Sequence, residues 1–249
     1  MRRALICALS ACLLLAFSSG TALSAAAQRR PGSARPSTRV LSNERTDTRW
    51  ANPLRRALIR LAPSERSKAI ATVKMHTELG FANVYLLLAQ WTSRSGHTWV
   101  HLRVPGRPNG RTGWVPRSAL GVYHVTYREL VVDRAQAELR LYNHGHLIWH
   151  APIGTGKPST PTPAGHFWIR EEFRVAPGNP SYGPYAFGTS DYSVLADWPD
   201  GGVIGIHGTD EPWLIPGHPS HGCIRLLNAD VSWLAQDGRL PIGTPVLVR

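Results

Sequence analysis

One cysteine stands out in the C-terminal half of the sequence. Cys223 lies in the run SHGCIRL, residues 220–226, directly after a histidine and a glycine. A thiol becomes an effective nucleophile when a nearby imidazole removes its proton. Two imidazoles compete for this role: His221, which is close in sequence, and His207, which follows the β-type run VIGI at residues 203–206. We expect Cys223 to be the nucleophile and His207, at a strand end, to be its general base.

A glycine at position 222, directly before the cysteine, also suits the proposed chemistry. Because glycine lacks a β-carbon, it lets a substrate carbonyl approach the backbone, and N–H groups near Cys223 would then hold an oxyanion. A helix that began at once after Cys223 would further favour the thiolate through its N-terminal dipole. These residues together predict acyl transfer by a cysteine nucleophile.

Other motifs that suggest a ligand fail on spacing. The run GTGKPST, residues 154–160, resembles a phosphate-binding loop, but Ala151 stands where its first glycine belongs and Pro158 interrupts the expected helix. The sequence contains no HExxH pattern, and His144 and His146 flank a glycine in a predicted turn. We therefore predict no cofactor and no metal, with a zinc site built from His207, His221 and Cys223 as an alternative.

The N-terminal residues explain why the cysteine is alone. Residues 1–27 contain two arginines, an apolar run too short for a membrane span of about 20 residues, and an A-x-A cleavage pattern, which is typical of a secretory signal peptide. A lipoprotein box ending at Cys12 is the alternative. Cleavage near Gln28 removes Cys7 and Cys12 and exports the chain to the periplasm or the cell wall. Cys223 is then a lone thiol in an oxidising compartment, where it cannot form a disulfide within the chain.

The chain is strongly basic, with a formal net charge of +12. Such a balance favours polyanionic partners, and for an exported protein these are cell-wall polymers or an anionic membrane surface, contacted by the basic N-terminal region. The sequence contains no nucleic-acid-binding motif, so we predict no nucleic-acid partner.

The organisation of the chain follows from its composition. Residues 28–66 are polar and basic and predict a disordered tether, with a short amphipathic helix around Trp50–Leu61. Residues 67–122 contain short β-rich runs that predict a small β-barrel, and residues 123–249 predict a second, mostly β domain. In this second domain we expect a hairpin loop at Asn143–Gly145 and one short helix that Asn228 caps.

The residues around Cys223 resemble a known family. The run SHGCIRL, the following Asn228 and Asp230, and the upstream run IHGT at residues 206–209 are similar to the L,D-transpeptidase (YkuD) catalytic domain. Residues 99–116 resemble the Src-homology-3-like (SH3-like) modules of bacterial wall enzymes. The resemblance implies an all-β protein: a YkuD-type β-sandwich with one short helix after the cysteine, preceded by a small β-barrel.

The resemblance also assigns roles to residues. Cys223 would be the nucleophile and His207 the base, with the Gly208 carbonyl holding the far imidazole nitrogen. His221 and Gly222 would line the oxyanion side, and Arg225 would bind substrate or brace the cysteine loop. We add Ser220, Tyr182 and Tyr185 as candidate substrate-binding residues. The Gly/Pro-rich segment 171–200, with further aromatics at Tyr192 and Trp198, would form a wall or lid over the site.

The implied substrate is peptidoglycan. The enzyme would cross-link tetrapeptide stems through their third residue and be acylated by carbapenems. The alternatives are an L,D-carboxypeptidase, in which water replaces the acceptor amine, and a catalytically decayed wall-binding protein. A cysteine endopeptidase of the NlpC/P60 type is disfavoured, because in that class the cysteine precedes the histidine.

Overall fold

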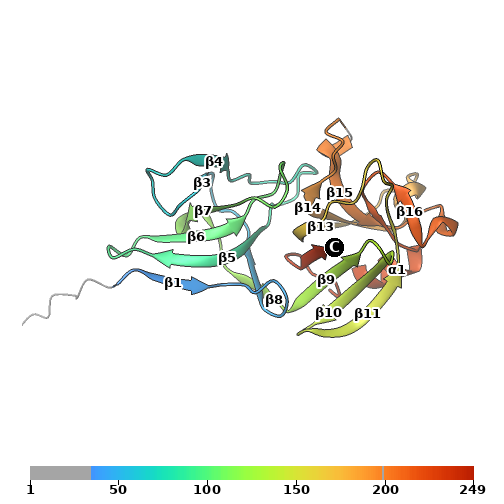
Figure 1. Cartoon of the computed structure of the whole chain (residues 1–249), viewed down its shortest axis with the longest axis horizontal. Helices are drawn as coiled ribbons and strands as arrows, with labels where there is room; N and C mark the ends of the chain where they lie inside the picture. The colour runs from blue at the N-terminus through green and yellow to red at the C-terminus, as the bar shows by residue number, and fades with distance from the viewer. Residues whose placement is uncertain (1–34, 198) are drawn as a thin grey trace, which may run out of the picture. The chain divides into compact units, whose positions relative to one another are not determined.

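Short strands separated by turns make up most of the chain, as the sequence predicts. The computed structural model describes residues 35–197 and 199–249, whose strands form two sheets (Figure 1). The predicted signal peptide and residues 28–34 of the predicted tether lie outside the described residues. The structure confirms the predicted all-β class.

The first sheet has eight strands in the order β4-β3-β7-β6-β5-β2-β8, and β1 pairs with β5. Its core contains aliphatic residues that alternate along the strands, such as Val100 and Leu102, both fully buried. The strands are β1 (Ser37–Val40), β2 (Thr48–Ala51), β3 (Leu58–Arg60), β4 (Ala69–Thr72), β5 (Tyr85–Thr92), β6 (Thr98–Arg103), β7 (Thr112–Pro116) and β8 (His124–Thr126).

The helix predicted around Trp50–Leu61 is wrong, because this segment contains β2 and β3. The backbone groups of these strands pair across the sheet: β2 with β5 and β8, and β3 with β4 and β7. The Trp50 ring instead stacks on His124 at 4.3 Å, and Ile59 is fully buried in the sheet.

The predicted disorder of the tether is also wrong for its described part. The four residues of β1 are exposed, so burial does not hold them in place. Their backbone pairs with β5 in antiparallel register, from Ser37 opposite Thr92 to Val40 opposite Ala89. Composition reflects the burial of side chains, whereas the pairing of backbone groups orders even a polar edge strand.

The second sheet has ten strands in the order β11-β10-β9-β18-β13-β14-β15-β17-β12-β16. The predicted hairpin loop is confirmed, since His144 and Gly145 join β10 to β11 with positive φ angles of 48° and 79°. The strands are β9 (Arg128–Asp133), β10 (Glu138–Asn143), β11 (His146–Pro152), β12 (Gly154–Gly156), β13 (Gly165–Arg174), β14 (Tyr185–Tyr192), β15 (Val203–His207), β16 (Gly217–Ser220), β17 (Ile224–Arg225) and β18 (Pro245–Val248).

The segment predicted as a lid, residues 171–200, contributes a strand to this sheet. β14 lies between β13 and β15 and is hydrogen-bonded to both. The Gly/Pro-rich stretches on either side of it form single-turn 3₁₀ helices, Pro180–Tyr182 and Pro199–Gly202. Two further 3₁₀ turns span Arg117–Ala119 and Pro212–Leu214.

The predicted short helix is confirmed as α1 (Asn228–Ala235), which buries Val231 and Leu234. The residue at its N-cap is Leu227, however, and Asn228 is the first helical residue. The Asn228 side chain instead accepts a hydrogen bond from the Thr209 backbone at 2.9 Å. Within the described ranges, no helix has both the length and the apolar character needed to cross a membrane.

A buried ion pair joins the two sheets, which belong to one compact unit, Ser33–Arg249. Arg170 on β13 is almost fully buried, and its Nη2 donates to Glu78 Oε2 at 2.9 Å. The Tyr192 hydroxyl donates to the other Glu78 oxygen at 2.7 Å. Beside this pair, Trp168 packs against Val84, whose carbonyl accepts from the indole Nε1 at 2.9 Å.

The ionisation of Glu78 is tied to this pair. Burial alone raises the pKa of its carboxyl, but the Arg170 charge and the Tyr192 hydrogen bond lower it to about 2. The stabilisation is therefore present above the ordinary carboxyl pKa of 4.5 and is lost as the pH falls toward 2.

Replacing Glu78 by glutamine should leave the Arg170 charge buried without its counter-ion. We expect the free energy of unfolding at neutral pH to fall by about 3 kcal/mol, and this deficit to shrink as the pH falls from 4.5 toward 2. Urea unfolding across this range measures it. The exposed Lys74, which also contacts Glu78, is the control: Lys74→Gln should cost less than about 1 kcal/mol. Equal effects of both substitutions would contradict the role of the buried pair.

Candidate active site

The parallel pairing of two strands brings Cys223 and His207 to one place. β15 ends at His207, and β17 begins directly after Cys223. In their register His207 lies opposite Arg225, so the cysteine falls beside Gly205, whose N–H donates to the sulfur at 3.4 Å. A cavity of about 300 Å³ opens there, lined by both residues together with Ser220, His221, Arg225 and Tyr182 among others.

The His207 imidazole is buried and held in one tautomer. Its Nδ1 lies 2.6 Å from the Gly208 carbonyl oxygen, as the resemblance implied. A carbonyl can only accept, so Nδ1 carries the proton and donates it, which leaves the lone pair on Nε2. Burial lowers the pKa of His207 from 6.5 to about 4, against the opposing effect of the Gly208 carbonyl and with a further contribution from Arg225. The imidazole is therefore neutral near neutral pH and fit to accept a proton.

The Cys223 thiol is also neutral at rest. Burial raises its pKa, the Gly205 N–H lowers it, the nearby Asp191 raises it and Arg225 lowers it, with a net upward shift. The helix dipole expected to favour the thiolate does not follow the cysteine directly, because β17 lies between Cys223 and α1. The site therefore combines a neutral thiol with a neutral imidazole, and the proton must move as the sulfur attacks.

Ser220 shapes the turn that carries the cysteine. Its buried hydroxyl donates to the Cys223 carbonyl at 2.6 Å and accepts from the Gly222 N–H at 3.1 Å. Both hydrogen bonds lie within the turn, so the structure gives Ser220 a positioning role. Ser220 also lines the cavity, and its contact with substrate stays a prediction.

Gly222 is required by the backbone, which differs from the reason inferred from sequence. Its φ of 128° is a conformation that side chains rarely adopt, and a β-carbon there would lie 2.7 Å from Ile204 Cδ1. Its carbonyl accepts from the buried Thr162 hydroxyl at 2.7 Å. Because its N–H already donates to Ser220, that N–H is not available to an oxyanion in this arrangement.

His221 has a partner that sequence reasoning missed. Lys157 Nζ lies 2.9 Å from His221 Nε2, and since an ammonium can only donate, this nitrogen is the acceptor. The Lys157 backbone N–H also donates to the Ser220 carbonyl at 2.9 Å. Lys157 belongs to the run GTGKPST, which was considered only as a phosphate loop. Its neighbours in space follow from the pairing of β12 with β16, which the sequence does not reveal.

Arg225 both anchors a neighbouring segment and lines the cavity. Its Nη1 donates to Glu211 Oε2 at 2.7 Å, so it braces the segment after His207. It also lines the cavity with Cys223, and its Nε is buried without a hydrogen-bond partner among the described residues. One side of the guanidinium is thus anchored while the residue faces the site.

The predicted aromatic residues separate into two groups. The Tyr182 ring packs on the His207 ring with centroids 4.5 Å apart, and Tyr182 lines the cavity. The Tyr185 hydroxyl instead accepts from Arg174 at 2.6 Å, and Tyr192 is buried at the Glu78 pair. Both occupy β14, so neither forms part of a lid, and the structure does not bring Tyr185 to the site. The Trp198 side chain lies outside the described residues.

Asn228 at the start of α1 fixes the segment after His207. Its Oδ1 accepts from the Thr209 backbone, and a β-carbon on Gly208 would lie only 2.2 Å from this oxygen. Gly208 must therefore be glycine for the helix to approach, and this close contact orients the carbonyl that binds His207. The resemblance included Asn228 and gave it no role.

The zinc alternative does not fit these contacts. His207 Nδ1 is bound to a carbonyl and His221 Nε2 to an ammonium. Over residues 35–197 and 199–249, no group of three or more His, Cys, Asp or Glu side chains is arranged to hold a metal ion.

Comparison with known proteins gives the family. The model of the L,D-transpeptidase catalytic domain, YkuD, matches residues 127–248. A Bacillus subtilis protein named L,D-transpeptidase YkuD is 33% identical over 145 residues, which cover 58% of this chain and 72% of that protein. The chain belongs to the L,D-transpeptidase (YkuD) family. The protein of the same name from Bacillus licheniformis is 38% identical over 124 residues, which cover 50% of this chain and 66% of that protein.

A solved structure shows a similar extent of match. The catalytic domain of the E. faecium L,D-transpeptidase, determined by NMR, is 27% identical with a TM-score of 0.37, and the match covers 49% of this chain and 96% of that one. The first sheet, β1–β8, precedes the residues that match the family model. Its likeness to SH3-like modules therefore stays a prediction.

Gly205 offers a test of the arrangement. A β-carbon there would lie 3.6 Å from His207 Cδ2 and 4.0 Å from Cys223 Sγ, in ordinary contact with both. We expect Gly205→Ala to fold normally but to slow alkylation of Cys223 by iodoacetamide roughly tenfold to a hundredfold, because the methyl group stands beside both reacting side chains. Gly121→Ala, in the loop before β8 and outside the second sheet, is the control and should leave the rate unchanged. A folded Gly205→Ala protein with the original alkylation rate would contradict this geometry.

The ionisation of His207 gives a second test. Its imidazole resonances in NMR spectra should titrate near pH 4, well below the ordinary value of 6.5, because burial disfavours the charged form. Titration of His207 at or above 6.5 would show a charged imidazole paired with a thiolate and would contradict a neutral resting pair.

Proposed function

We propose that this chain is an exported acyltransferase that cross-links the stem peptides of peptidoglycan. Family membership supports the reaction class, and the observation that carries it is the His207 tautomer, which leaves Nε2 as a base in the cavity that contains Cys223. Export follows from the predicted signal peptide. The substrate is a tetrapeptide stem with an L-configured diamino acid at position three and a terminal D-alanine.

The first half-reaction forms an acyl-enzyme. The Cys223 sulfur attacks the carbonyl carbon of stem residue three while His207 Nε2 takes the thiol proton, which gives a tetrahedral oxyanion and an imidazolium. The intermediate collapses as the C–N bond to D-alanine breaks, and the imidazolium returns its proton to the leaving amine. A thioester on Cys223 and free D-alanine result.

The charge that develops on His207 is balanced without an aspartate. The Gly208 carbonyl accepts from Nδ1 at 2.6 Å, and this dipole is the partner of the imidazolium when it forms. The raised pKa of Cys223 also makes its sulfur a strong nucleophile once the proton has left, since nucleophilicity rises with basicity.

The second half-reaction passes the acyl group on. The side-chain amine of a second stem attacks the thioester, His207 removes a proton from the amine, and Cys223 leaves with a proton to complete a 3→3 cross-link. Water in place of the amine would give an L,D-carboxypeptidase. We propose that the amine is the acceptor and that a carbapenem, whose strained amide mimics the donor carbonyl, acylates the same sulfur.

A decayed wall-binding protein is the second candidate. The ordered contacts around the cysteine argue against decay, because the turn at Ser220, the Gly205 hydrogen bond and the His207 tautomer all serve to position Cys223. A protein without activity has no need to keep a partly buried thiol beside a buried base.

The test uses residues 28–249 incubated with disaccharide tetrapeptides, with products identified by mass spectrometry. We expect dimers joined through residue three and release of D-alanine. Cys223→Ala should abolish turnover, and His207→Gln should lower it about 10²- to 10⁴-fold. The exposed His150→Gln is the matched control and should retain full activity.

The other products separate the candidates. If tripeptides form without dimers, the activity is that of an L,D-carboxypeptidase and not of a cross-linking enzyme. Turnover that survives Cys223→Ala, or an absence of both turnover and carbapenem adduct in the original protein, would overturn the proposed mechanism.

A further inference from the structure

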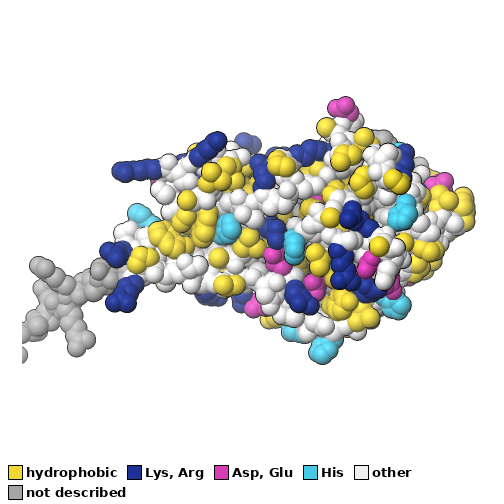
Figure 2. All heavy atoms as spheres, viewed as in Figure 1, with side chains coloured by type: hydrophobic (Ala, Val, Ile, Leu, Met, Phe, Trp, Pro, Cys, Tyr) yellow, Lys and Arg dark blue, Asp and Glu magenta, His cyan; other side chains and the backbone are white. Residues whose placement is uncertain are grey.

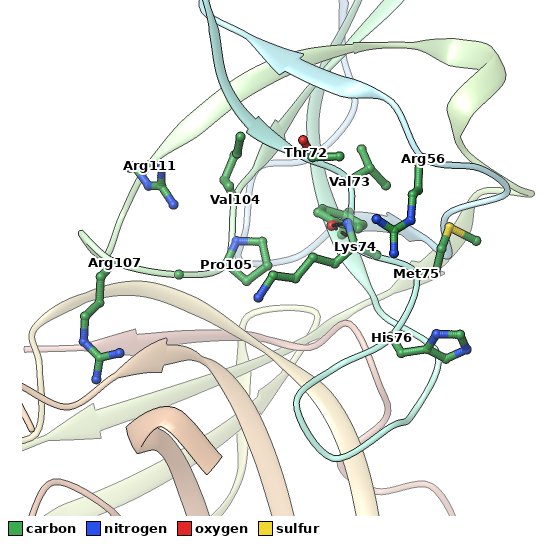
Figure 3. Close-up of a pocket in the computed structure, with 13 residues that line it drawn as sticks. Arg56, Thr72, Val73, Lys74, Met75, His76, Val104, Pro105, Arg107 and Arg111 are labelled. Carbon is green, nitrogen blue, oxygen red and sulfur yellow. Dashed lines mark hydrogen bonds between the residues drawn. The ribbon is translucent and has the colours of Figure 1, made fainter. Parts of the chain in front are cut away.

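A second cavity lies in the first sheet and its adjoining loops, apart from the catalytic residues. It has a volume of about 690 Å³. Figure 3 shows four cationic side chains around it, Arg56, Lys74, Arg107 and Arg111, with apolar side chains that include Val73 and Val104 between them. We call it the basic cavity.

The positive charges of the basic cavity are poorly compensated. None of its lining residues is acidic. Lys74 lies 3.3 Å from Glu78, but this carboxylate is already paired with the buried Arg170. Arg111 Nη1 donates a long hydrogen bond to the Ile70 carbonyl at 3.4 Å. An oxyanion bound in the cavity would accept charge-assisted hydrogen bonds from these cationic groups.

We propose that the basic cavity binds the carboxylates of a short acidic peptide, namely a further stem of the polymer on which the enzyme acts. The identification of this peptide rests on the proposed function, whereas the charge and shape of the cavity do not. On the face seen in Figure 2, Lys and Arg side chains are spread over both sheets, so overall charge alone does not mark one place. The basic cavity marks one place because its cationic side chains surround a concave space.

The shape and lining of the cavity favour a peptide over other anionic partners. A membrane presents a broad, flat surface, which does not match a concave cavity of this size. A phosphate polymer is polar throughout, whereas the walls here include Val73, Val104, Pro105 and Met75. A stem peptide carries free carboxylates for the cationic groups and alanine methyl groups for the apolar walls.

The basic cavity is connected to the active site through Arg107. The Arg107 guanidinium donates to the backbone carbonyls of Ser193 at 2.6 Å, Leu195 at 3.2 Å and Gly201 at 2.9 Å. The Ser193 hydroxyl in turn donates to the His221 carbonyl at 3.0 Å and lines the catalytic cavity. One residue thus borders the basic cavity and also holds the loop beside Cys223, so a peptide in the basic cavity would lie on the same enzyme surface as the reacting stem.

The test measures binding without catalysis. Hydrogen exchange of the Cys223→Ala protein with free tetrapeptide should show protection at residues 71–76 and 104–111, besides the active-site segments. The double substitution Arg56→Gln and Lys74→Gln should remove this protection and weaken binding there roughly tenfold or more. Arg107 is left unchanged because it braces the 193–201 loop. The matched control, Arg66→Gln with Lys68→Gln, removes the same charge from exposed positions outside the cavity and should change nothing.

Each other outcome has a defined meaning. Absence of protection at 71–76 and 104–111, or equal weakening by the control pair, would overturn the proposal. Protection of these segments by a poly(glycerol phosphate) chain but not by the peptide would show that the ligand class is wrong. Protection by the peptide together with no turnover of the original enzyme would leave the basic cavity standing while the proposed function fails.

Discussion

The site depends on one parallel strand pair. β15 and β17 are joined in a register that sets His207 opposite Arg225, and this register fixes where the chain emerges just before β17. The Cys223 sulfur therefore lies beside the Gly205 N–H and not at the free end of a loop. A shift of one residue in this register would turn the side chains to the other face of the sheet and separate thiol from base.

Burial of this pair has an electrostatic consequence. It raises the pKa of the Cys223 thiol and lowers that of the His207 imidazole, so both charged forms are disfavoured at rest. An uncharged thiol is less prone to unwanted oxidation, because the thiolate is the reactive form. The Gly208 carbonyl, placed by the contact of Gly208 with Asn228, supplies the dipole that would accommodate an imidazolium in the proposed mechanism.

Much of the fold and the central pair followed from sequence, because β-type runs and a lone cysteine near histidines are local signals. What the sequence could not supply depended on contacts between distant segments. Lys157 contacts His221 because β12 pairs with β16. Tyr185 lies away from the site because β14 is an inner strand of the sheet. The exposed strand β1 was missed since composition describes side chains and not backbone pairing. Gly222 was selected for its access to an oxyanion, whereas the structure requires glycine there because of its φ angle and its contact with Ile204.

The central claim is that the resting site holds a neutral thiol beside a neutral imidazole. The most direct measurement is the ultraviolet absorbance of the Cys223 thiolate as a function of pH, with Cys223→Ser as the blank. The account predicts no thiolate at neutral pH and an absorbance rise only above the ordinary range for a cysteine. A thiolate already present at neutral pH, and lost in His207→Gln, would show a preformed ion pair and contradict the account.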